Sequence, residues 1–312
     1  MPVRYLLGRL LQALATLFIV SVLAFLVPRL VPGDPALQVL GPLNSTPEKV
    51  AAVRAQMGLD QPMLQQYAHF LGGALHFDFG ESLRTKDPVA PTMLDALVPS
   101  LAIVLLSIML AVLIAVPLGV YAAVKRNRAG DHTVRFLGVV GYATPSFLVG
   151  LVLVLVFSVN LAVLPVQGYG EGFVGHLQSL VLPVVTVAFA ITPLFVRTLR
   201  SALINTLTTD FIEAARARGL SGQRVLYRHA LRVSLLPTVT LIGLSIGGAL
   251  SFTVVVENIF SIPGLGRLLV DSVNNRDYTV IQALILMFAG VTLLSSLITD
   301  LLYCLLDPRI RL

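Results

Sequence analysis

Charged residues are scarce in this 312-residue sequence. Asp, Glu, Lys and Arg together make up 12% of it, whereas a typical soluble domain contains about 25%. Hydrophobic residues make up 56%, and the mean hydropathy is +0.87. This composition excludes a soluble layered fold and also a disordered chain, which requires low hydrophobicity. The charges that do occur are grouped between long uncharged stretches, which is typical of an integral membrane protein whose spans are helices.

Cysteine, tryptophan and lysine are rare or entirely missing. Cys304 is the only cysteine, so the chain has no intrachain disulfide and no CxxC metal or redox site. Only three of the 22 basic residues are lysine, and no basic run is interleaved with aromatic residues. The formal charge of +6 therefore does not indicate a nucleic acid as partner. We interpret it as the charge bias that orients a protein in the membrane.

Motifs for catalysis and nucleotide binding are missing as well. The sequence contains no HExxH, GxSxG or GxxxxGK[ST], and its five histidines lack metal-ligand spacing. If this protein uses ATP, another chain must bind it. The uncharged stretches also lack the mid-membrane ionisable groups by which carriers bind a coupling ion. A standalone secondary carrier and an intramembrane enzyme remain the alternatives from other classes, and these absences disfavour both.

Six uncharged stretches each reach, or nearly reach, the roughly 20 residues that a membrane helix needs. They cover residues 10–28, 96–124, 136–170, 172–196, 233–256 and 278–299. Within the third stretch we expect one helix over residues 136–160, followed by an extended loop around Pro165. The first stretch is too long for the apolar part of a signal peptide, so we interpret it as a retained span.

The distribution of lysine and arginine predicts the orientation. The two termini, the link between the second and third spans and the link between the fourth and fifth hold 15 of the 22 basic residues. The same segments hold only 5 of the 16 acidic residues. Because basic loops are retained on the cytoplasmic side, we expect both termini in the cytoplasm.

Two connections are long enough to hold structure of their own. We divide the chain into an N-terminal segment with the first span (1–30), an external loop with short helices (31–98), a five-helix core (99–303) and a cytoplasmic tail (304–312). In the external loop, one helix is expected to begin at Thr46-Pro47-Glu48 and another to run from Gln61 to Leu75. This loop is predicted either to lie on the membrane or to contact something outside the cell.

The second long connection, residues 198–232, is cytoplasmic and begins with a predicted short helix. Asp210 suits the N-cap, and Glu213 three residues later would complete a capping box. The alanines that follow are strong helix formers, and their small side chains would let a groove approach the backbone closely. Gly219 suits a left-handed residue that stops the helix.

A second, basic helix is predicted to begin at Ser221. Its arginines recur at four-residue spacing at positions 224, 228 and 232, with Tyr227 and His229 beside them. Two interpretations remain open for the pair of helices. It either docks a cytoplasmic protein or lies on the membrane surface with snorkelling arginines.

This cytoplasmic loop resembles the EAA loop of the permease subunits of binding-protein-dependent ABC importers, in the form found in dipeptide, oligopeptide and nickel permeases. The matching residues are Glu213-Ala214-Ala215-Arg216-Ala217-Arg218-Gly219, His229-Ala230-Leu231-Arg232 and Leu235-Leu236-Pro237. His229 stands where the broader consensus has an aliphatic residue, and the proline is displaced. Both departures suit the peptide branch of the family.

Further matches to the same family extend over nearly the whole chain. In its first third they are Gly33-Asp34-Pro35, Gly58-Leu59-Asp60 with Gln66-Tyr67, and Asp78-Phe79-Gly80 with Ser82. Toward the C-terminus they are the string ENIFSIPGLG from Glu257 to Gly266, then Arg276-Asp277-Tyr278 and Leu306-Asp307-Pro308-Arg309. The EAA loop and the ENIFSIPGLG string are the most specific of these matches.

The resemblance implies an all-α integral membrane protein with six transmembrane helices and the type I ABC importer (MetI-like) permease fold. It implies a B-type subunit in the bacterial cytoplasmic (inner) membrane, paired with a C-type permease, two ATPase subunits and an extracytoplasmic peptide-binding protein. This chain would bind no cofactor, because ATP and Mg would lie on the ATPase subunits. The implied cargo is a dipeptide or oligopeptide, with nickel, haem and glutathione as alternatives within the family.

Two sets of site residues follow from the resemblance. The set implied to dock on the ATPase comprises Asp210, Glu213, Ala214, Ala215, Arg216, Arg218, Gly219, Arg224, Arg228 and His229. The set implied to lie at the outer mouth, near the binding protein, comprises Glu257, Asn258, Phe260, Pro263, Gly264, Gly266, Arg276 and Asp277. No catalytic or metal-binding residue is implied.

Overall fold

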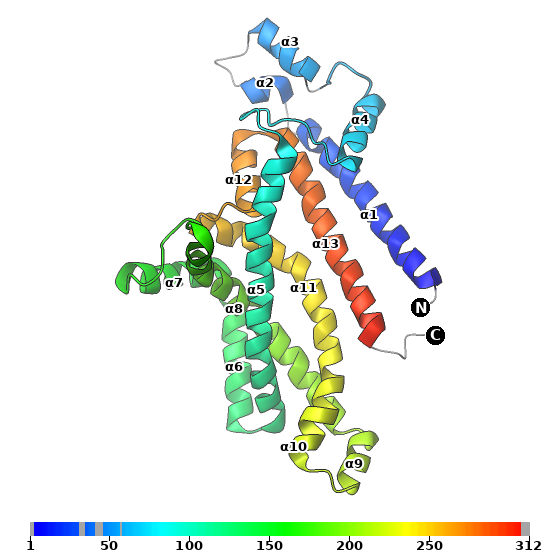
Figure 1. Cartoon of the computed structure of the whole chain (residues 1–312), viewed down its shortest axis with the longest axis vertical. Helices are drawn as coiled ribbons and strands as arrows, with labels where there is room; N and C mark the ends of the chain where they lie inside the picture. Colours follow the sequence, from blue (N-terminus) through cyan, green and yellow to red (C-terminus); the bar gives the residue numbers. More distant parts are fainter. Residues whose placement is uncertain (1–2, 31–34, 41–45, 57, 307–312) are drawn as a thin grey trace. The chain divides into compact units, whose positions relative to one another are not determined.

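The computed structural model describes residues 3–30, 35–40, 46–56 and 58–306, and most of them are helical (Figure 1). In chain order the elements are α1 (Val3–Leu30), α2 (Pro35–Leu40), α3 (Pro47–Gln56), α4 (Met63–Leu75), α5 (Val89–Val124), α6 (Ala129–Ala143), α7 (Ser146–Leu153), the π-helix η1 (Val154–Asn160), α8 (Gly172–Leu207), α9 (Asp210–Ala217), α10 (Gly222–Arg224), the π-helix η2 (Val225–Ala230), α11 (Leu231–Phe260), α12 (Leu265–Asn275) and α13 (Tyr278–Leu306). The described residues form no β-strand beyond one isolated bridge between Glu81 and Pro88. The all-α prediction is confirmed.

Among the residues quoted for the family resemblance, Gly33, Asp34 and residues 307–312 lie outside the described residues.

Within the part of the chain that the structure describes, five helical segments are long and apolar enough to cross a membrane. They are Leu7–Leu30, Val89–Val124, Gly172–Leu207, Gly222–Phe260 and Tyr278–Leu301. A sixth span results if α6 and the helix formed by α7 and η1 are counted as one broken span. Five or six spans agree with the six predicted from the uncharged stretches.

The third predicted span differs from the expectation, and the single helix over residues 136–160 is wrong. α6 ends at Ala143, and the helix from Ser146 to Asn160 is bent by 95° relative to it. Thr144 and Pro145 are extended, with ψ of 121° and 131°. The proline ring clashes with a helical conformation of the residue before it, which ends α6 at this point. The extended loop expected around Pro165 is present between η1 and α8.

The chain divides into two compact units, and each is described by itself. The first consists of Ser100–Ile262 together with α13 from Leu294 onward. The second consists of Val3–Pro99 and Pro263–Leu293. The predicted external loop belongs to the second unit, together with α1, α12 and the beginnings of α5 and α13.

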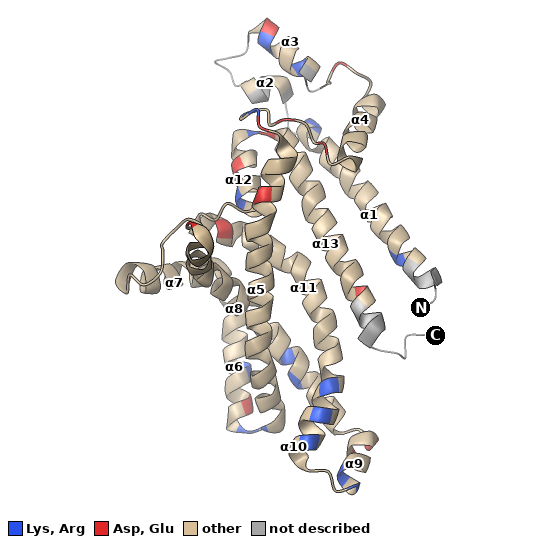
Figure 2. Ribbon diagram, in the orientation of Figure 1, with Lys and Arg blue, Asp and Glu red and all other residues tan. Residues whose placement is uncertain are grey.

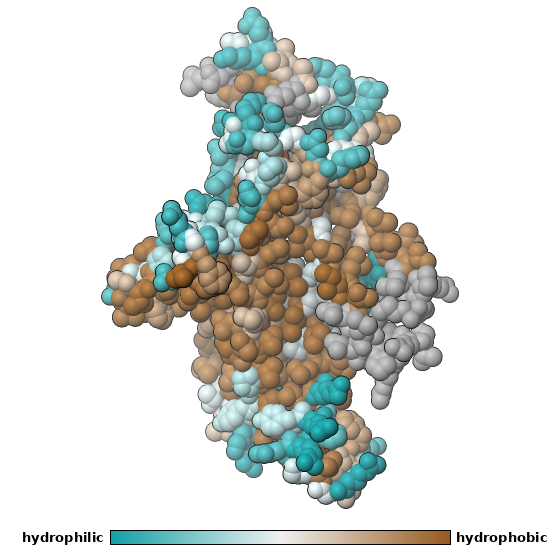
Figure 3. Space-filling model, viewed as in Figure 1, coloured by the Kyte–Doolittle hydropathy of each residue, from teal (hydrophilic) through white to brown (hydrophobic). Residues whose placement is uncertain are grey.

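In the first unit, α8 is the central helix and packs against α6, α7 and α11. In its most apolar stretch 61% of the residues are buried, compared with 22–33% in the other four candidate spans. Phe195, Leu199 and Leu203 of α8 are fully buried. In the other spans most residues are not buried within this chain, so their apolar side chains are available to contact lipid or another subunit. Figure 3 shows this hydrophobic surface over α5 and α6.

Small residues allow the helices of the first unit to approach closely. A Cβ atom on Gly119 of α5 would lie 3.1 Å from Leu199 Cδ2, and no Cβ would fit on Gly243 of α11 beside Thr299 of α13. The Ser295 hydroxyl donates a hydrogen bond of 2.9 Å to the Gly243 carbonyl oxygen. Such contacts hold membrane helices together, because the surrounding lipid provides no hydrophobic driving force.

In the second unit, the two helices expected in the external loop are present as α3 and α4. Pro47 is the first residue of α3, and the Thr46 hydroxyl accepts a hydrogen bond of 3.4 Å from the Lys49 N–H. The start of α5, α12 and the start of α13 share an apolar core that includes Val89, Met93 and Leu284. α4 packs against α1, where the rings of Tyr67 and Phe25 lie with their centroids 5.3 Å apart.

Asp277 fixes the loop before α5 to the start of α13. Its buried carboxylate accepts hydrogen bonds from the Ser82 hydroxyl and from the backbone N–H of Leu83 (3.3 Å) and Val280 (3.5 Å). The Arg84 side chain donates a further hydrogen bond of 2.9 Å to the Asn275 carbonyl oxygen. The loop from residue 82 to 84 is thus bound to the turn between α12 and α13.

Candidate functional site

The connection between α8 and α11 forms the predicted short helix, α9, but its N-terminus differs from the prediction. Thr209 is the N-cap and Asp210 is the first helical residue, so the capping box between Asp210 and Glu213 is wrong. The N–H groups of Ile212 and Glu213 instead bond to the Thr209 carbonyl oxygen, at 3.0 and 3.2 Å. Asp210 and Glu213 still lie in the first turn, where the helix dipole favours negative charge.

The C-terminus of α9 confirms the predicted glycine stop. Gly219 has φ of +78°, a left-handed conformation that glycine adopts without steric penalty. Its N–H bonds to the Arg216 carbonyl oxygen at 2.9 Å, and the Leu220 N–H bonds to that of Ala215 at 3.4 Å. These two bonds form a Schellman motif. Leu220 then packs against a buried cluster that includes Ala215 and Val225, which fixes the chain beyond the turn.

Only one side of α9 is exposed. Ile212 and Ala215 are buried in the same cluster as Leu203 of α8 and Ala230 of η2. We therefore reassign Ala215 from contact with a partner to internal support of α9. The exposed members of the predicted docking set in and after α9 are Asp210, Glu213, Ala214, Arg216, Arg218 and Gly219.

Phe211 is an exposed residue of α9 that lies outside the predicted docking set. Its side chain is 45% exposed, and it lies three and seven residues before Ala214 and Arg218, so the three share one helical face. A large apolar side chain that the described residues leave nearly half exposed suits contact with another protein. The available signal was an aromatic residue between two acidic positions in the first turn.

The basic helix begins as predicted at Ser221, whose hydroxyl accepts a hydrogen bond of 3.4 Å from the Arg224 N–H. After one turn it becomes the π-helix η2 and then continues directly into α11. Arg224, Arg228 and Arg232 are exposed, and His229 is half-buried. Figure 2 shows that Lys and Arg residues gather around α9, α10 and the start of α11.

The site is joined to the membrane spans at both ends. α8 ends three residues before α9, and η2 runs into α11 without a break. The Ser234 hydroxyl of α11 also donates to the Thr206 hydroxyl of α8 at 2.9 Å. α9 is therefore connected by short links to both α8 and α11.

A buried ion pair connects α6 to α8 in the same unit. Asp131 is fully buried, and its two carboxylate oxygens accept hydrogen bonds of 2.6 Å from Nε and Nη2 of Arg200. One of these oxygens also accepts from the Asn127 N–H at 2.9 Å. Nothing in the spacing of Asp131 and Arg200 along the sequence indicates that they meet.

The residues implied to lie at the outer mouth fall into two groups. Glu257, Phe260, Gly264, Gly266 and Asp277 are buried, whereas Asn258, Pro263 and Arg276 are exposed. In the first unit, the Ser100 hydroxyl of α5 donates a hydrogen bond of 2.6 Å to the Glu257 carboxylate. The buried group supports the local structure, and the exposed group can contact a partner. Within the described residues, no cluster of His, Cys, Asp or Glu could hold a metal ion.

Comparison with known protein families gives two matches that together cover nearly the whole chain. A family model described as binding-protein-dependent transport system inner membrane component matches residues 115–312. A model for the N-terminal part of such membrane components matches residues 2–104.

Individual proteins of named function are similar over almost their full length. The glutathione transport system permease protein GsiC of Escherichia coli (strain K12) is 40% identical over 307 residues, which are 98% of each chain. GsiC of Salmonella typhi has the same identity and coverage.

A solved structure of the MetNI methionine ABC transporter in an inward-facing conformation has the same fold. Its TM-score is 0.57 at 16% sequence identity, and the alignment covers 69% of this chain and 96% of that one. At this level of identity the match concerns the fold alone, and it agrees with the type I importer fold.

Proposed function

Because the chain belongs to the family of binding-protein-dependent transport system inner membrane components, we propose that it is the B-type permease subunit of an ATP-driven importer of short peptides. The chain is a transporter subunit and not an enzyme. The observation that carries the proposal is α9, a short helix with an exposed acidic and alanine face, held between two membrane spans. Such a helix suits the transfer of motion from a cytoplasmic motor.

In this proposal, α9 docks in a groove of an ATPase subunit through Glu213, Ala214 and Phe211. Arg224 and Arg228 of the basic helix lie beside that contact. ATP and Mg bind to the ATPase subunits. When the ATPase subunits close on ATP, α9 moves with them and displaces α8 and α11. Differential binding of the two permease conformations by the ATPase then shifts the population toward the outward-open state.

The orientation proposed from the basic residues places both termini and α9 in the cytoplasm. We expect a cysteine at Arg218 to react with a membrane-impermeant maleimide only after the membrane is permeabilised. A cysteine at Thr85 is expected to react in intact cells stripped of their outer membrane. Both variants are made in a Cys304→Ser background so that no other thiol reacts. The opposite labelling pattern would contradict the orientation.

Short peptides are the proposed cargo, and glutathione is the first to test. Glutathione is a tripeptide, and the similar GsiC proteins are named as its permeases. We expect cells that lack their own peptide importers to accumulate labelled glutathione or a labelled di- or tripeptide when the full importer is expressed. Accumulation of nickel or haem without peptide would refute the peptide cargo.

The proposed assembly also predicts which proteins co-purify with this chain. One C-type permease and two ATPase subunits are expected per copy of this chain, and the extracytoplasmic binding protein is expected to join reversibly. Purification of this chain as a lone homodimer would contradict the assembly, because α9 would then have no motor to receive motion from.

A further inference from the structure

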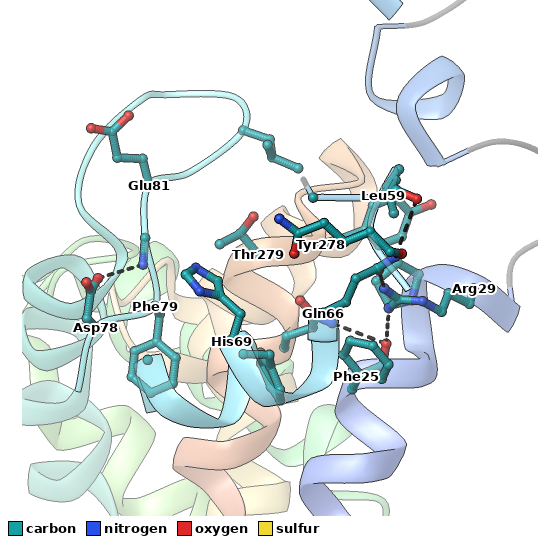
Figure 4. Close-up of a pocket in the computed structure, with 18 of the residues that line it drawn as sticks. Phe25, Arg29, Leu59, Gln66, His69, Asp78, Phe79, Glu81, Tyr278 and Thr279 are labelled. Carbon is teal, nitrogen blue, oxygen red and sulfur yellow. Dashed lines mark hydrogen bonds between the residues drawn. The ribbon is translucent and has the colours of Figure 1, made fainter. Parts of the chain in front are cut away.

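The second unit contains a cavity of about 510 Å³ that the coupling function does not use (Figure 4). Four parts of the chain form its walls: the last turns of α1, the segment from α3 through α4, the loop after α4, and the first turns of α13. This volume lies within the range of about 300–1,000 Å³ typical of sites for small molecules.

Hydrogen bonds within the described residues hold the walls in place. The Gln66 amide donates to the Gln61 carbonyl oxygen at 2.7 Å and accepts from the Arg29 guanidinium. Arg29 also donates to the Phe25 carbonyl oxygen at 2.6 Å, and its guanidinium lies 3.8 Å from the centroid of the Phe25 ring. Gln282 of α13 donates to the Ala24 carbonyl oxygen at 3.2 Å. The cavity is therefore preformed, which lowers the entropic cost of binding.

Several polar groups in the walls retain unused bonding capacity. Among the described residues, the His69 imidazole and the Glu81 carboxylate make no hydrogen bond, and both side chains are exposed. Asp78 uses one carboxylate oxygen to accept from the Gly80 N–H at 3.0 Å, and its other oxygen is available. In Figure 4, Arg29 lies on one side of the cavity and Asp78 and Glu81 lie on the other, with His69 between them.

This separation of charges indicates the chemistry of the ligand. A guanidinium with spare donors binds a carboxylate, and a pair of carboxylates binds an ammonium group. Phe25, Phe70 and Phe79 add apolar wall that suits amino-acid side chains. A molecule with an anionic group at one end and an ammonium group at the other would satisfy both sides at once.

We propose that this cavity binds a short zwitterionic peptide, with its carboxylate toward Arg29 and its ammonium group toward Asp78 and Glu81. The proposal rests on the proposed peptide cargo and adds to it a cargo site on the permease itself. On the predicted orientation, the cavity opens on the side where the binding protein delivers the peptide. It would hold the peptide before translocation.

The test measures peptide binding to the purified complex of permeases and ATPases, without the binding protein, in phosphatidylglycerol nanodiscs. The probes are labelled glutathione and trialanine, together with N-acetylated trialanine. Wild-type complex is expected to bind glutathione or trialanine. The double variant Asp78→Asn with Glu81→Gln should weaken this binding at least tenfold, since it removes the charges that meet the ammonium group. N-acetylated trialanine should bind the wild-type complex about as weakly as trialanine binds the double variant. The double variant should bind N-acetylated trialanine no more weakly than wild type does.

Asp87→Asn is the matched control, because Asp87 is exposed in the same loop but does not line the cavity. Its affinity is expected to stay within twofold of wild type. No binding by wild type, an equal loss in Asp87→Asn, or indifference to N-acetylation would each overturn the proposal. Displacement of the peptide by added phosphatidylethanolamine would assign the cavity to a lipid headgroup instead and would also overturn it.

The outcome is separable from that of the proposed function. Peptide uptake by the complete importer without binding to the isolated complex would refute this site and leave the cargo unchanged. Binding to the complex with no uptake of peptide would refute the proposed cargo and leave the site standing.

Discussion

Replacing Gly219 by proline is expected to abolish transport while the permease remains in the membrane. Gly219 has φ of +78°, whereas the proline ring restricts φ to about −65°. Proline also lacks the N–H that donates to the Arg216 carbonyl oxygen. The turn therefore cannot form, and α9 loses its fixed direction relative to the spans. Loss of a docking contact of only about 1.4 kcal/mol would already weaken ATPase binding tenfold.

Gly222→Pro is the matched control for this variant. Gly222 is the first residue of α10, a position that suits proline, and a Cβ atom there would meet nothing within 4 Å. Ser221 before it is extended, with ψ of 146°, as proline requires of its neighbour. Uptake and recovery of the ATPase with the tagged permease should be lost in Gly219→Pro and kept in Gly222→Pro. Wild-type uptake by Gly219→Pro would refute docking through α9.

Replacing Arg200 by methionine is expected to destabilise the first unit strongly. Asp131 is fully buried, and Arg200 supplies both of its side-chain hydrogen bonds. Removing one partner of a buried ion pair costs about 3–5 kcal/mol, because the other charge remains without compensation. The free energy of unfolding, measured by denaturant titration in mixed micelles, should fall by this amount.

Arg197→Met is the control, since Arg197 lies on the same helix but is exposed. An exposed substitution of this kind changes stability by about 0.5 kcal/mol or less. Adding Asp131→Asn to Arg200→Met should recover part of the loss, because a neutral amide is less costly to bury than an unpaired carboxylate. Equal effects of Arg197→Met and Arg200→Met would show that the ion pair does not stabilise the fold.

Much of the fold could be predicted from hydrophobicity alone. A membrane span requires a long apolar stretch regardless of which helices it packs against. Five spans in the described residues therefore coincide with predicted uncharged stretches. The third span was mispredicted because the chain bends sharply at Pro145 although its apolar stretch continues through the bend. Hydropathy measures the length of a stretch and contains no information about its direction.

The candidate site was predictable where it depends on neighbours in sequence. The turn at Gly219 is closed by two hydrogen bonds, one from the Gly219 N–H to Arg216 and one from the Leu220 N–H to Ala215, which join residues only three and five positions apart. The predicted N-cap, Asp210, was wrong by one residue. Thr209 and Asp210 both suit an N-cap, and the structure places Thr209 there. Local chemistry therefore defined the helix and its turn to within one residue.

The sequence by itself determined that this protein crosses the membrane, that it contains no recognisable ATP site and that a helix with a glycine stop lies between two spans. Only the tertiary structure decided that Ala215 faces inward, that Asp131 meets Arg200, and that Arg29 and Asp78 line one cavity. The reason is physical. Hydrophobicity and turn conformation depend on a residue and its neighbours, whereas these contacts join residues tens of positions apart, and packing chooses among the pairs that the sequence allows.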